Sequence, residues 1–401
     1  MDRRQLLCSA VGTSVAAALA GCVSSVEDRL SDPGSIGDRD PAPLTGGTTT
    51  WPGEGFDGAN TGFNPDAELL EVEPSAAPIT RDGSGIDTTL GGGGVAVVDD
   101  RCYFGTGSGD VVCQTAPGER RWEYEADTAA GVRSIPSLAR DVVYVSSDNG
   151  TYALDAEDGE ELWTNDDAFV RYGSSVLTTD HLYAIGGGGV VALDVETGVR
   201  DWSADAPHPH ALAVADGTAY TASSVSDDGG VAALADGEEL WTRDDLDDHR
   251  APPVIADDVV LVCDGDGRLE ALDREGGSTV WSYDRRGDGS ATPTVAHGQV
   301  YFPSGNGPRT VCLDLESGEE LWDLSTDLSR SQPVATADGV YVGTPNEGLF
   351  AVEPDGTVRW HDEELRVDGG MAAVGDTLYA IAFGGPFGSG DLYALTTANE
   401  G

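Results

Sequence analysis

The sequence predicts an all-β fold, an eight-bladed β-propeller in which each blade is a four-stranded antiparallel sheet. Three observations lead to this prediction. A short motif ending in tryptophan recurs, as DGEELW at 158–163 and 236–241 and as SGEELW at 317–322. Seven tryptophans from Trp122 to Trp360 lie 38 to 41 residues apart, which is the period of propeller blades. Gly is abundant, at 55 of 401 residues, and long helical patterns are scarce.

Each repeat contains stretches that are typical of β-strands. In the repeat at 136–163, the apolar run Val142–Val145 indicates one strand, and a tight Asn-Gly hairpin leads into the next strand, TYALD at 151–155. A turn that ends in Gly159 then leads into the strand that carries tryptophan, and glycine allows the positive φ angle that such a turn needs. With the short innermost strand that begins at Pro136, the repeat supplies four strands.

A small residue stands eight to ten positions before each of the seven tryptophans. We expect the tryptophan to fill the gap between neighbouring blades, while the small residue leaves space for the indole. The pairs are Cys113 with Trp122, Ala153 with Trp163, Ala192 with Trp202, Ala233 with Trp241, Ala271 with Trp281, Cys312 with Trp322, and Ala351 with Trp360.

The two ends of the chain each hold half of such a pair. Ala394 takes the small-residue position of an eighth repeat, but no tryptophan follows it. Trp51 is an eighth tryptophan, but no small residue precedes it in this pattern. We therefore expect the N-terminal strand at Trp51 to complete the last blade beside Ala394. That strand would close the ring and cover its free sheet edges.

The repeat resembles the PQQ-like β-propeller repeat family, over about 51–397, in its small residue, glycine turn and tryptophan. The resemblance implies that these residues form an interblade docking motif. The wider superfamily includes quinoprotein dehydrogenases, which hold pyrroloquinoline quinone and calcium in the central funnel. This sequence has no adjacent Cys-Cys pair and no haem motif. No cofactor, metal ligand or catalytic residue is predicted, and a PQQ-dependent dehydrogenase is the alternative.

The N-terminal residues resemble an export signal. Arg3 and Arg4 precede an uncharged, mostly apolar run from Leu6 to Ala20, as in twin-arginine signals. The run ends in a lipobox-like LAGC, which makes Cys22 the expected site of lipid attachment. An uncleaved anchor is the alternative. In either case the remainder lies outside the cytoplasm, and lipid on Cys22 would hold it at the outer face of the cytoplasmic membrane.

This interpretation divides the chain into three segments. We expect a signal with lipobox at 1–22, a flexible tether at 23–47 and the propeller at 48–397. The tether is rich in Ser, Asp, Gly and Pro and has few large apolar residues.

The charge balance restricts the partners. The chain has 71 acidic and 22 basic residues, a formal net charge of −49, and every basic residue is arginine. Nucleic acid is excluded as a partner because its phosphates would be repelled. The absence of lysine resembles exported proteins of extreme halophiles of the archaeal type, in which molar salt screens self-repulsion. We expect a monomer that dilute buffer destabilises.

One repeated position gathers arginines despite this composition. When the repeats are aligned on Tyr144, three arginines fall three residues before the innermost strand, where they would surround the funnel mouth. Such a collar suits an anionic group or an acidic peptide. Alternatively, the arginines pair with acidic residues of neighbouring blades. The aligned position holds Arg133, Tyr172, Pro209, Arg250, Ser290, Arg330 and Asp368, and His210 and His249 adjoin it. The candidate ligand contacts are Arg133, Tyr172, His210, Arg250, Arg330 and Asp368.

The leading functional hypothesis is a non-catalytic, lipid-anchored propeller that binds another extracytoplasmic protein or peptide as a scaffold or envelope adaptor. The nearest analogy is the propeller lipoprotein of the bacterial outer-membrane barrel-assembly machinery, which also resembles a PQQ-repeat protein without cofactor. The alternatives are the dehydrogenase and a solute-binding or sensing module for an anionic ligand.

Overall fold

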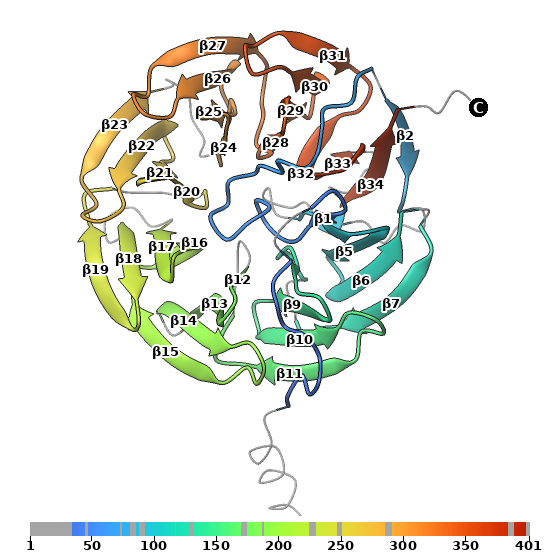
Figure 1. Cartoon of the computed structure of the whole chain (residues 1–401), viewed down its shortest axis with the longest axis vertical. Helices are drawn as coiled ribbons and strands as arrows, with labels where there is room; N and C mark the ends of the chain where they lie inside the picture. The colour runs from blue at the N-terminus through green and yellow to red at the C-terminus, as the bar shows by residue number, and fades with distance from the viewer. Residues whose placement is uncertain are drawn as a thin grey trace, which may run out of the picture.

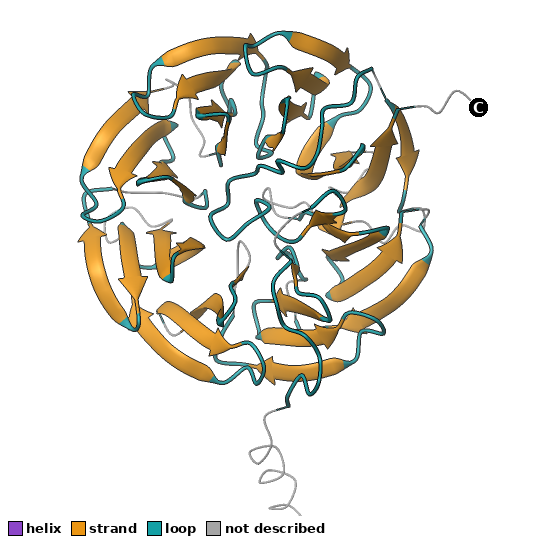
Figure 2. Cartoon of the chain, in the orientation of Figure 1, coloured by secondary structure: helices purple, strands orange, loops and turns teal. Residues whose placement is uncertain are grey.

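The computed structural model of the chain describes residues 34–44, 47–72, 74–80, 86–87, 93–116, 118–128, 131–169, 175–186, 188–223, 230–246, 251–284, 291–383 and 389–397. Over these residues all regular elements are β-strands, arranged as eight sheets around a ring (Figures 1 and 2). No helix within them has the length and apolar character to cross a membrane. The predicted eight-bladed, all-β fold is confirmed. The signal segment and Cys22 lie outside the described residues.

Seven blades are built from consecutive strands, so each blade is a local unit of the chain. Blade 1 contains β4 (Ala96–Val98), β5 (Arg101–Gly105), β6 (Asp110–Thr115) and β7 (Arg120–Glu125). Blade 2 contains β8 (Ser137–Leu138), β9 (Val142–Ser146), β10 (Thr151–Asp155) and β11 (Glu161–Asn165). Blade 3 contains β12 (Val176–Leu177), β13 (His181–Gly186), β14 (Gly189–Asp194) and β15 (Arg200–Asp205). Blade 4 contains β16 (Pro209–Ala215), β17 (Thr218–Ser223), β18 (Val231–Ala235) and β19 (Glu238–Arg243).

The next three blades repeat this order from the innermost to the outermost strand. Blade 5 contains β20 (Val254–Ala256), β21 (Val259–Cys263), β22 (Arg268–Asp273) and β23 (Thr279–Asp284). Blade 6 contains β24 (Thr294–Ala296), β25 (Gln299–Phe302), β26 (Arg309–Asp314) and β27 (Glu320–Ser325). Blade 7 contains β28 (Val334–Thr336), β29 (Gly339–Thr344), β30 (Gly348–Val352) and β31 (Val358–Asp362).

Seven of the eight predicted small residues lie directly opposite their tryptophan on the two outer strands of one blade. In blade 2, for example, Ala153 pairs with Trp163, and the register shifts just after this pair. The indole of Trp163 is 2% exposed, and its Nε1 donates to the Val195 carbonyl of the next blade at 3.2 Å. The same link to a following blade is made by Trp122, Trp241, Trp281 and Trp322. The tryptophan therefore docks one blade onto the next.

In five of the described turns, at Gly159, Gly198, Gly277, Gly318 and Gly356, the glycine lies too close to an indole for any side chain. Gly198 of blade 3 has a φ angle of 67°, and a Cβ atom at this position would lie 2.5 Å from Cε3 of Trp163. Only glycine combines the left-handed conformation with such close approach to the indole. The recurrence of small residue, glycine and tryptophan in the sequence therefore reflects one interblade contact repeated around the ring.

The ring is closed by an N-terminal strand in the last blade, but a different strand from the one expected. Blade 8 contains β32 (Val367–Val374), β33 (Thr377–Phe383), β34 (Ser389–Thr396) and, as its outermost strand, β2 (Ser75–Pro78); β3 (Ile86–Asp87) extends the pairing along β34. Ala394 lies opposite Ala77, not opposite Trp51. Ala77 therefore occupies the register position that tryptophan holds in the other blades.

The predicted pairing of Trp51 with Ala394 is therefore wrong. Trp51 lies in β1 (Thr50–Trp51), which adds to the inner edge of blade 1 through Val97. Its indole is 3% exposed and packs edge-on against Phe56, with ring centroids 5.1 Å apart. The eighth tryptophan is thus a core residue near the centre of the ring and not a docking residue.

Residues 34–44 and 47–70, here called the strap, cross one mouth of the central channel (Figure 1). Part of this segment was expected to be a flexible tether, but residues 34–44 pack on blades 2 and 3. Ile36 is 1% exposed, and its amide donates to the Glu196 carbonyl at 2.9 Å. Arg39 forms an ion pair with Asp155 of blade 2. Burial of Ile36 and the backbone bonds fix these residues in place.

The strap then bonds to four successive blades. Backbone amides of the innermost strands donate to strap carbonyls: Val214 to Gly58 at 2.6 Å, Ile255 to Ala59 at 2.8 Å, Val295 to Thr61 at 2.8 Å, and Ala335 to Gly62 at 2.8 Å. The side chain of Asn60 donates to two further carbonyls, Leu212 O and Pro253 O, each at 3.1 Å. The strap therefore ties blades 4 to 7 together at this end of the channel.

Candidate functional site

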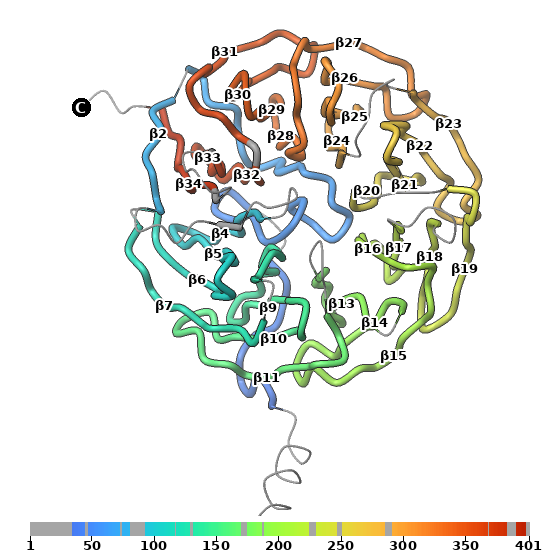
Figure 3. The backbone as a smooth tube through the Cα atoms, turned by 180° about the vertical axis from the view of Figure 1, so that it is seen from behind, coloured from blue at the N-terminus to red at the C-terminus, as the bar shows by residue number. Residues whose placement is uncertain are grey.

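The two mouths of the ring differ in what covers them. The strap contacts the turns between the first and second strands of the blades, at Asp141, Asp338 and Gly375. The predicted collar residues precede the first strands, so they lie at the opposite end of the channel. Figure 1 faces the mouth that the strap crosses, and Figure 3 faces the other mouth.

Three of the six candidate collar residues can be placed with their side chains. Arg133 is half-buried just before blade 2, His210 is half-buried in β16 of blade 4, and Arg330 is exposed just before blade 7. Nε and Nη2 of Arg330 both donate to Oδ1 of Asn306, at 3.3 and 2.8 Å. The structure therefore places these residues at one end of three different blades.

The remaining candidates are not placed in this way. Tyr172 and Arg250 lie outside the described residues, and Asp368 lies in β32 without a described side chain. Whether the six residues form a continuous collar stays a prediction.

At the strap-covered face, an arginine forms ion pairs and hydrogen bonds that link neighbouring parts of the chain. Arg359 of β31 contacts Asp338 at 2.9 Å and Glu353 at 3.3 Å, and it also donates to the Leu69 carbonyl of the strap. Arg330 at the opposite face instead bonds a neutral amide.

The cysteines are structural in character. Cys102, Cys113, Cys263 and Cys312 are buried and free of disulfides. Burial raises the pKa of the Cys113 thiol to about 11 and that of Cys312 to about 12. Both thiols stay protonated near neutral pH, so they act as compact apolar groups.

The acidic, histidine and cysteine side chains of the described residues do not cluster as metal ligands. No group of three or more His, Cys, Asp or Glu side chains gathers in a metal-binding arrangement within this part of the chain.

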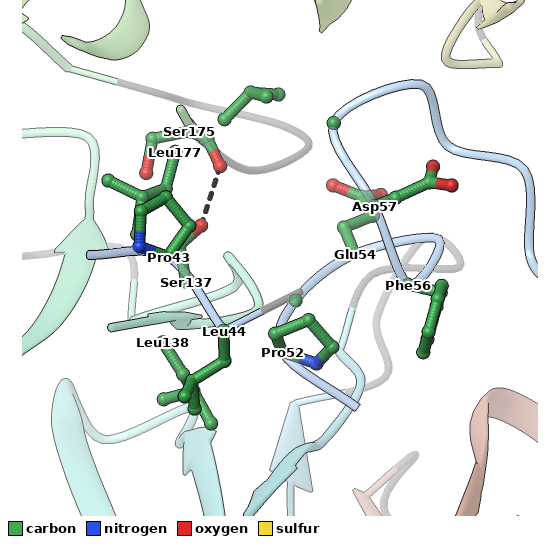
Figure 4. A pocket seen from close by; sticks show the side chains of 13 residues that line it. Pro43, Leu44, Pro52, Glu54, Phe56, Asp57, Ser137, Leu138, Ser175 and Leu177 are labelled. Carbon is green, nitrogen blue, oxygen red and sulfur yellow. Dashed lines mark hydrogen bonds between the residues drawn. The ribbon is translucent and has the colours of Figure 1, made fainter. Parts of the chain in front are cut away.

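A cavity that sequence reasoning missed lies between the strap and blades 2 and 3. Its volume is about 260 Å³. The walls come from strap residues, including Pro43, Phe56 and Asp57, and from the innermost strands β8 and β12 of the two blades (Figure 4). This cavity depends on the course of the strap, which has no counterpart in the repeats, so the repeat pattern could not reveal it.

Two polar features mark the cavity walls. Ser137 of β8 donates its hydroxyl to the Ser175 carbonyl at 2.8 Å, which joins blades 2 and 3. Ser175 is 3% exposed, and its own Oγ has no hydrogen-bond partner among the described residues. Asp57 accepts from the backbone and the hydroxyl of Thr61, at 3.0 and 2.7 Å. Burial raises the pKa of Asp57, against these two bonds, which lower it.

Comparison with known proteins identifies a family for this propeller. The family model described as outer membrane protein assembly factor BamB matches residues 63–233 and 227–399. The chain belongs to this family. The two matched regions together extend from the strap to the end of the last blade.

Individual relatives of this BamB-family chain are matched in part. BamB of Moranella endobia (strain PCIT) is 26% identical over 270 residues, which cover 66% of this chain and 62% of that protein. A quinohemoprotein alcohol dehydrogenase of Pseudomonas putida is 34% identical over 137 residues, 28% of this chain and 19% of that protein. The chain therefore spans less than two thirds of the length of these relatives.

Solved structures extend the comparison of the fold. A europium-containing methanol dehydrogenase superposes with a TM-score of 0.68 and 15% identity, covering 86% of this chain and 90% of the other. At this identity the likeness shows a common propeller fold and nothing about activity.

Proposed function

We propose that this BamB-family chain is a non-catalytic scaffold that binds another protein outside the cytoplasm. Membership of a family described as an assembly factor supports the proposal. The main supporting observation is the strap, which lies across one mouth of the ring. Backbone hydrogen bonds to blades 4 to 7 hold it there. A partner then binds at the opposite mouth.

The arginines at that mouth supply the recognition. Arg330 is exposed, and its guanidinium is oriented by Asn306, so its remaining N–H groups are free to meet a carboxylate of the partner. In a chain with a net charge of −49, arginines at this mouth create a local site for an acidic peptide. The proposal includes lipid attachment at Cys22 and a position at the outer face of the cytoplasmic membrane, supported by the LAGC motif and the paired arginines.

The experiment is proximity labelling by the full chain in its native envelope, followed by reconstitution with the purified partner in molar KCl. Replacing Arg133, Arg250 and Arg330 together by Gln should weaken partner binding by at least about tenfold, since charge-assisted bonds to carboxylates are lost. A matched control replaces Arg121, Arg140 and Arg200, which are exposed toward the strap-covered end of their blades. Equal partner binding by the two triple variants would contradict the proposal.

A quinone-dependent dehydrogenase is the second candidate, because the Pseudomonas putida relative is 34% identical over its matched region. It predicts that the purified chain, incubated with pyrroloquinoline quinone and calcium, retains quinone absorbance and reduces a dye in the presence of an alcohol. Absence of retained quinone after gel filtration would rule this candidate out.

A further inference from the structure

We propose that the cavity between the strap and blades 2 and 3 binds a small organic cation that has an apolar body and a hydrogen-bonding group at its far end. This inference is independent of the proposed function, because the cavity lies on the strap-covered face and the proposed partner binds at the other mouth. Three properties of the cavity support it: its size, its apolar walls and the placement of its polar groups.

The size admits one small molecule. A volume of about 260 Å³ corresponds to about nine water-sized groups, at about 30 Å³ for each. This is slightly below the range of about 300–1,000 Å³ for pockets that take drug-sized ligands. The ligand is therefore of the order of ten non-hydrogen atoms.

The walls are suited to an apolar body. Pro43 and Leu44 of the strap, Leu138 of β8 and Leu177 of β12 line the cavity, together with Phe56. Phe56 is 8% exposed and Leu138 is 2% exposed, so both walls are held rigidly by the core. Burying the apolar body of a ligand against these walls removes its apolar surface from water, which favours binding.

The charge of the cavity favours a cation. Glu54 and Asp57 both line it from the strap and are half-buried, and Figure 4 shows them on one side of the cavity. Partial burial lowers the effective dielectric constant and reduces screening by salt, so two carboxylates attract an ammonium group here more strongly than on an open surface. The net charge of −49 adds a long-range field of the same sign.

The opposite wall holds an unsatisfied hydroxyl. Ser175 lies beside Pro43 and Leu177, across the cavity from Glu54 and Asp57 (Figure 4). Its Oγ is buried and has no partner among the described residues, a situation that destabilises a folded protein. After a rotation about χ1 turns this oxygen toward the cavity, a ligand hydroxyl supplies the missing bond. The site thus offers an anionic end, an apolar middle and a neutral hydrogen-bonding end.

The test uses tyramine, an aromatic amine that carries a phenolic hydroxyl at its far end, added to the full chain in molar KCl. Isothermal titration calorimetry should give a Kd of about 1 mM or lower. Tyrosol, in which a hydroxyl replaces the ammonium, should bind at least about tenfold more weakly. Phenethylamine, which lacks the phenolic hydroxyl, should bind at least about threefold more weakly than tyramine.

Variants connect the binding to the cavity. Glu54→Gln should reduce the preference for tyramine over tyrosol, because only Asp57 then remains as an anion. Ser175→Ala should remove the preference for tyramine over phenethylamine. Leu177→Trp should fill the cavity and abolish binding, whereas Leu321→Trp, on the exposed surface of β27, should leave the affinity unchanged. Ser175→Ala removes an unpaired buried hydroxyl, so the fold tolerates it and this variant remains informative if Leu177→Trp does not fold.

Three results would overturn the proposal. The first is no tyramine binding up to about 20 mM. The second is equal affinity for tyramine and tyrosol in the wild-type chain, and the third is unchanged tyramine binding by folded Leu177→Trp. Calorimetry distinguishes each of these from the expected Kd of about 1 mM. None of these measurements involves the arginine variants at the opposite mouth, so this proposal and the proposed function fail separately.

Discussion

Each docking tryptophan works through several contacts at once. Trp163 packs against Gly198, lies 5.7 Å from the ring of Tyr144 between centroids, and donates to the next blade. Because each interblade contact of this kind needs the same three residue types, the sequence displays them at a fixed period. Asn60 joins blades 4 and 5 just as directly through its side chain, but it occurs once and has no periodic signal.

Two glycines separate the cost of backbone conformation from the cost of crowding the indole. Gly198 and Gly217 have φ angles of 67° and 76°, but only at Gly198 would a Cβ atom meet a ring, and nothing lies within 4 Å at Gly217. Gly217→Ala should cost about 1–2 kcal/mol for the left-handed conformation. Gly198→Ala should cost about 1–3 kcal/mol more, because the indole of Trp163 must move. Denaturant unfolding in molar KCl measures both, and equal costs would contradict the packing argument.

A tyrosine and a glutamate link the outer strands of blades 5 and 6. The Tyr283 hydroxyl donates to Glu320 at 2.5 Å, and Arg309 contacts the same carboxylate at 2.9 Å. The Tyr283 hydrogen bond lowers the pKa of Glu320, and Arg309 also lowers it, against burial, which raises it. A carboxylate whose pKa is depressed in the folded state stabilises the fold at pH values above the ordinary Glu pKa of about 4.3. This contribution is lost as the pH falls through the lower pKa of the folded state.

We therefore expect Tyr283→Phe to raise the pKa of Glu320 and to lower stability at pH 7 but not at a pH below the folded-state pKa. The difference in unfolding free energy between wild type and variant, measured at several pH values, tests this. In a Glu320→Gln background the same tyrosine change should show no such pH dependence. A wild-type–variant difference that is constant with pH would show that the hydroxyl bond does not depend on the charge of Glu320.

At the scale of single strands, the sequence predicted that an N-terminal strand closes the ring but not which strand it is. The number of blades and the presence of an N-terminal closing strand followed from counting small residues and tryptophans. The identity of that strand did not, because β2 reads Ser-Ala-Ala-Pro and carries no tryptophan, while Trp51 offered a matching but misleading aromatic residue.

The register of β2 predicts different effects for two neighbouring alanines. The Ile79 amide donates to the Leu392 carbonyl at 2.7 Å, so alternate residues toward the N-terminus, including Ala77, direct their amides to β34. Ala76, like the natural Pro78, then directs its N–H group away from the sheet.

We expect Ala77→Pro to weaken the closing strand and Ala76→Pro to be nearly neutral. Loss of a ladder bond and a steric clash with β34 should cost Ala77→Pro about 3 kcal/mol. Limited proteolysis near residues 75–78 and denaturant unfolding, both in molar KCl, distinguish the variants. Equal sensitivity of the two would contradict the assigned register.

At the scale of the whole molecule, the repeats determine the ring and the non-repeating segment determines the candidate sites. Alignment of the repeats placed Arg133 and Arg330 at one end of their blades, because each position is defined relative to a repeated strand. The cavity could not be predicted, since Glu54, Phe56 and Asp57 meet β8 and β12 only through the tertiary course of the strap. Periodicity gives relations between repeats and contains no information about a segment that crosses them.

The net charge of the whole chain leads to the last prediction. With 71 acidic and 22 basic residues, the folded ring brings like charges closer together than the unfolded chain does. Raising KCl from about 0.1 M to about 1 M shortens the Debye length from about 10 Å to about 3 Å. The thermal midpoint should therefore rise steeply over this range. Sucrose also favours compact states but does not screen charge, so at a similar osmolality it should raise the midpoint much less. A midpoint independent of KCl, or an equal rise in sucrose, would show that charge repulsion does not limit the stability of this fold.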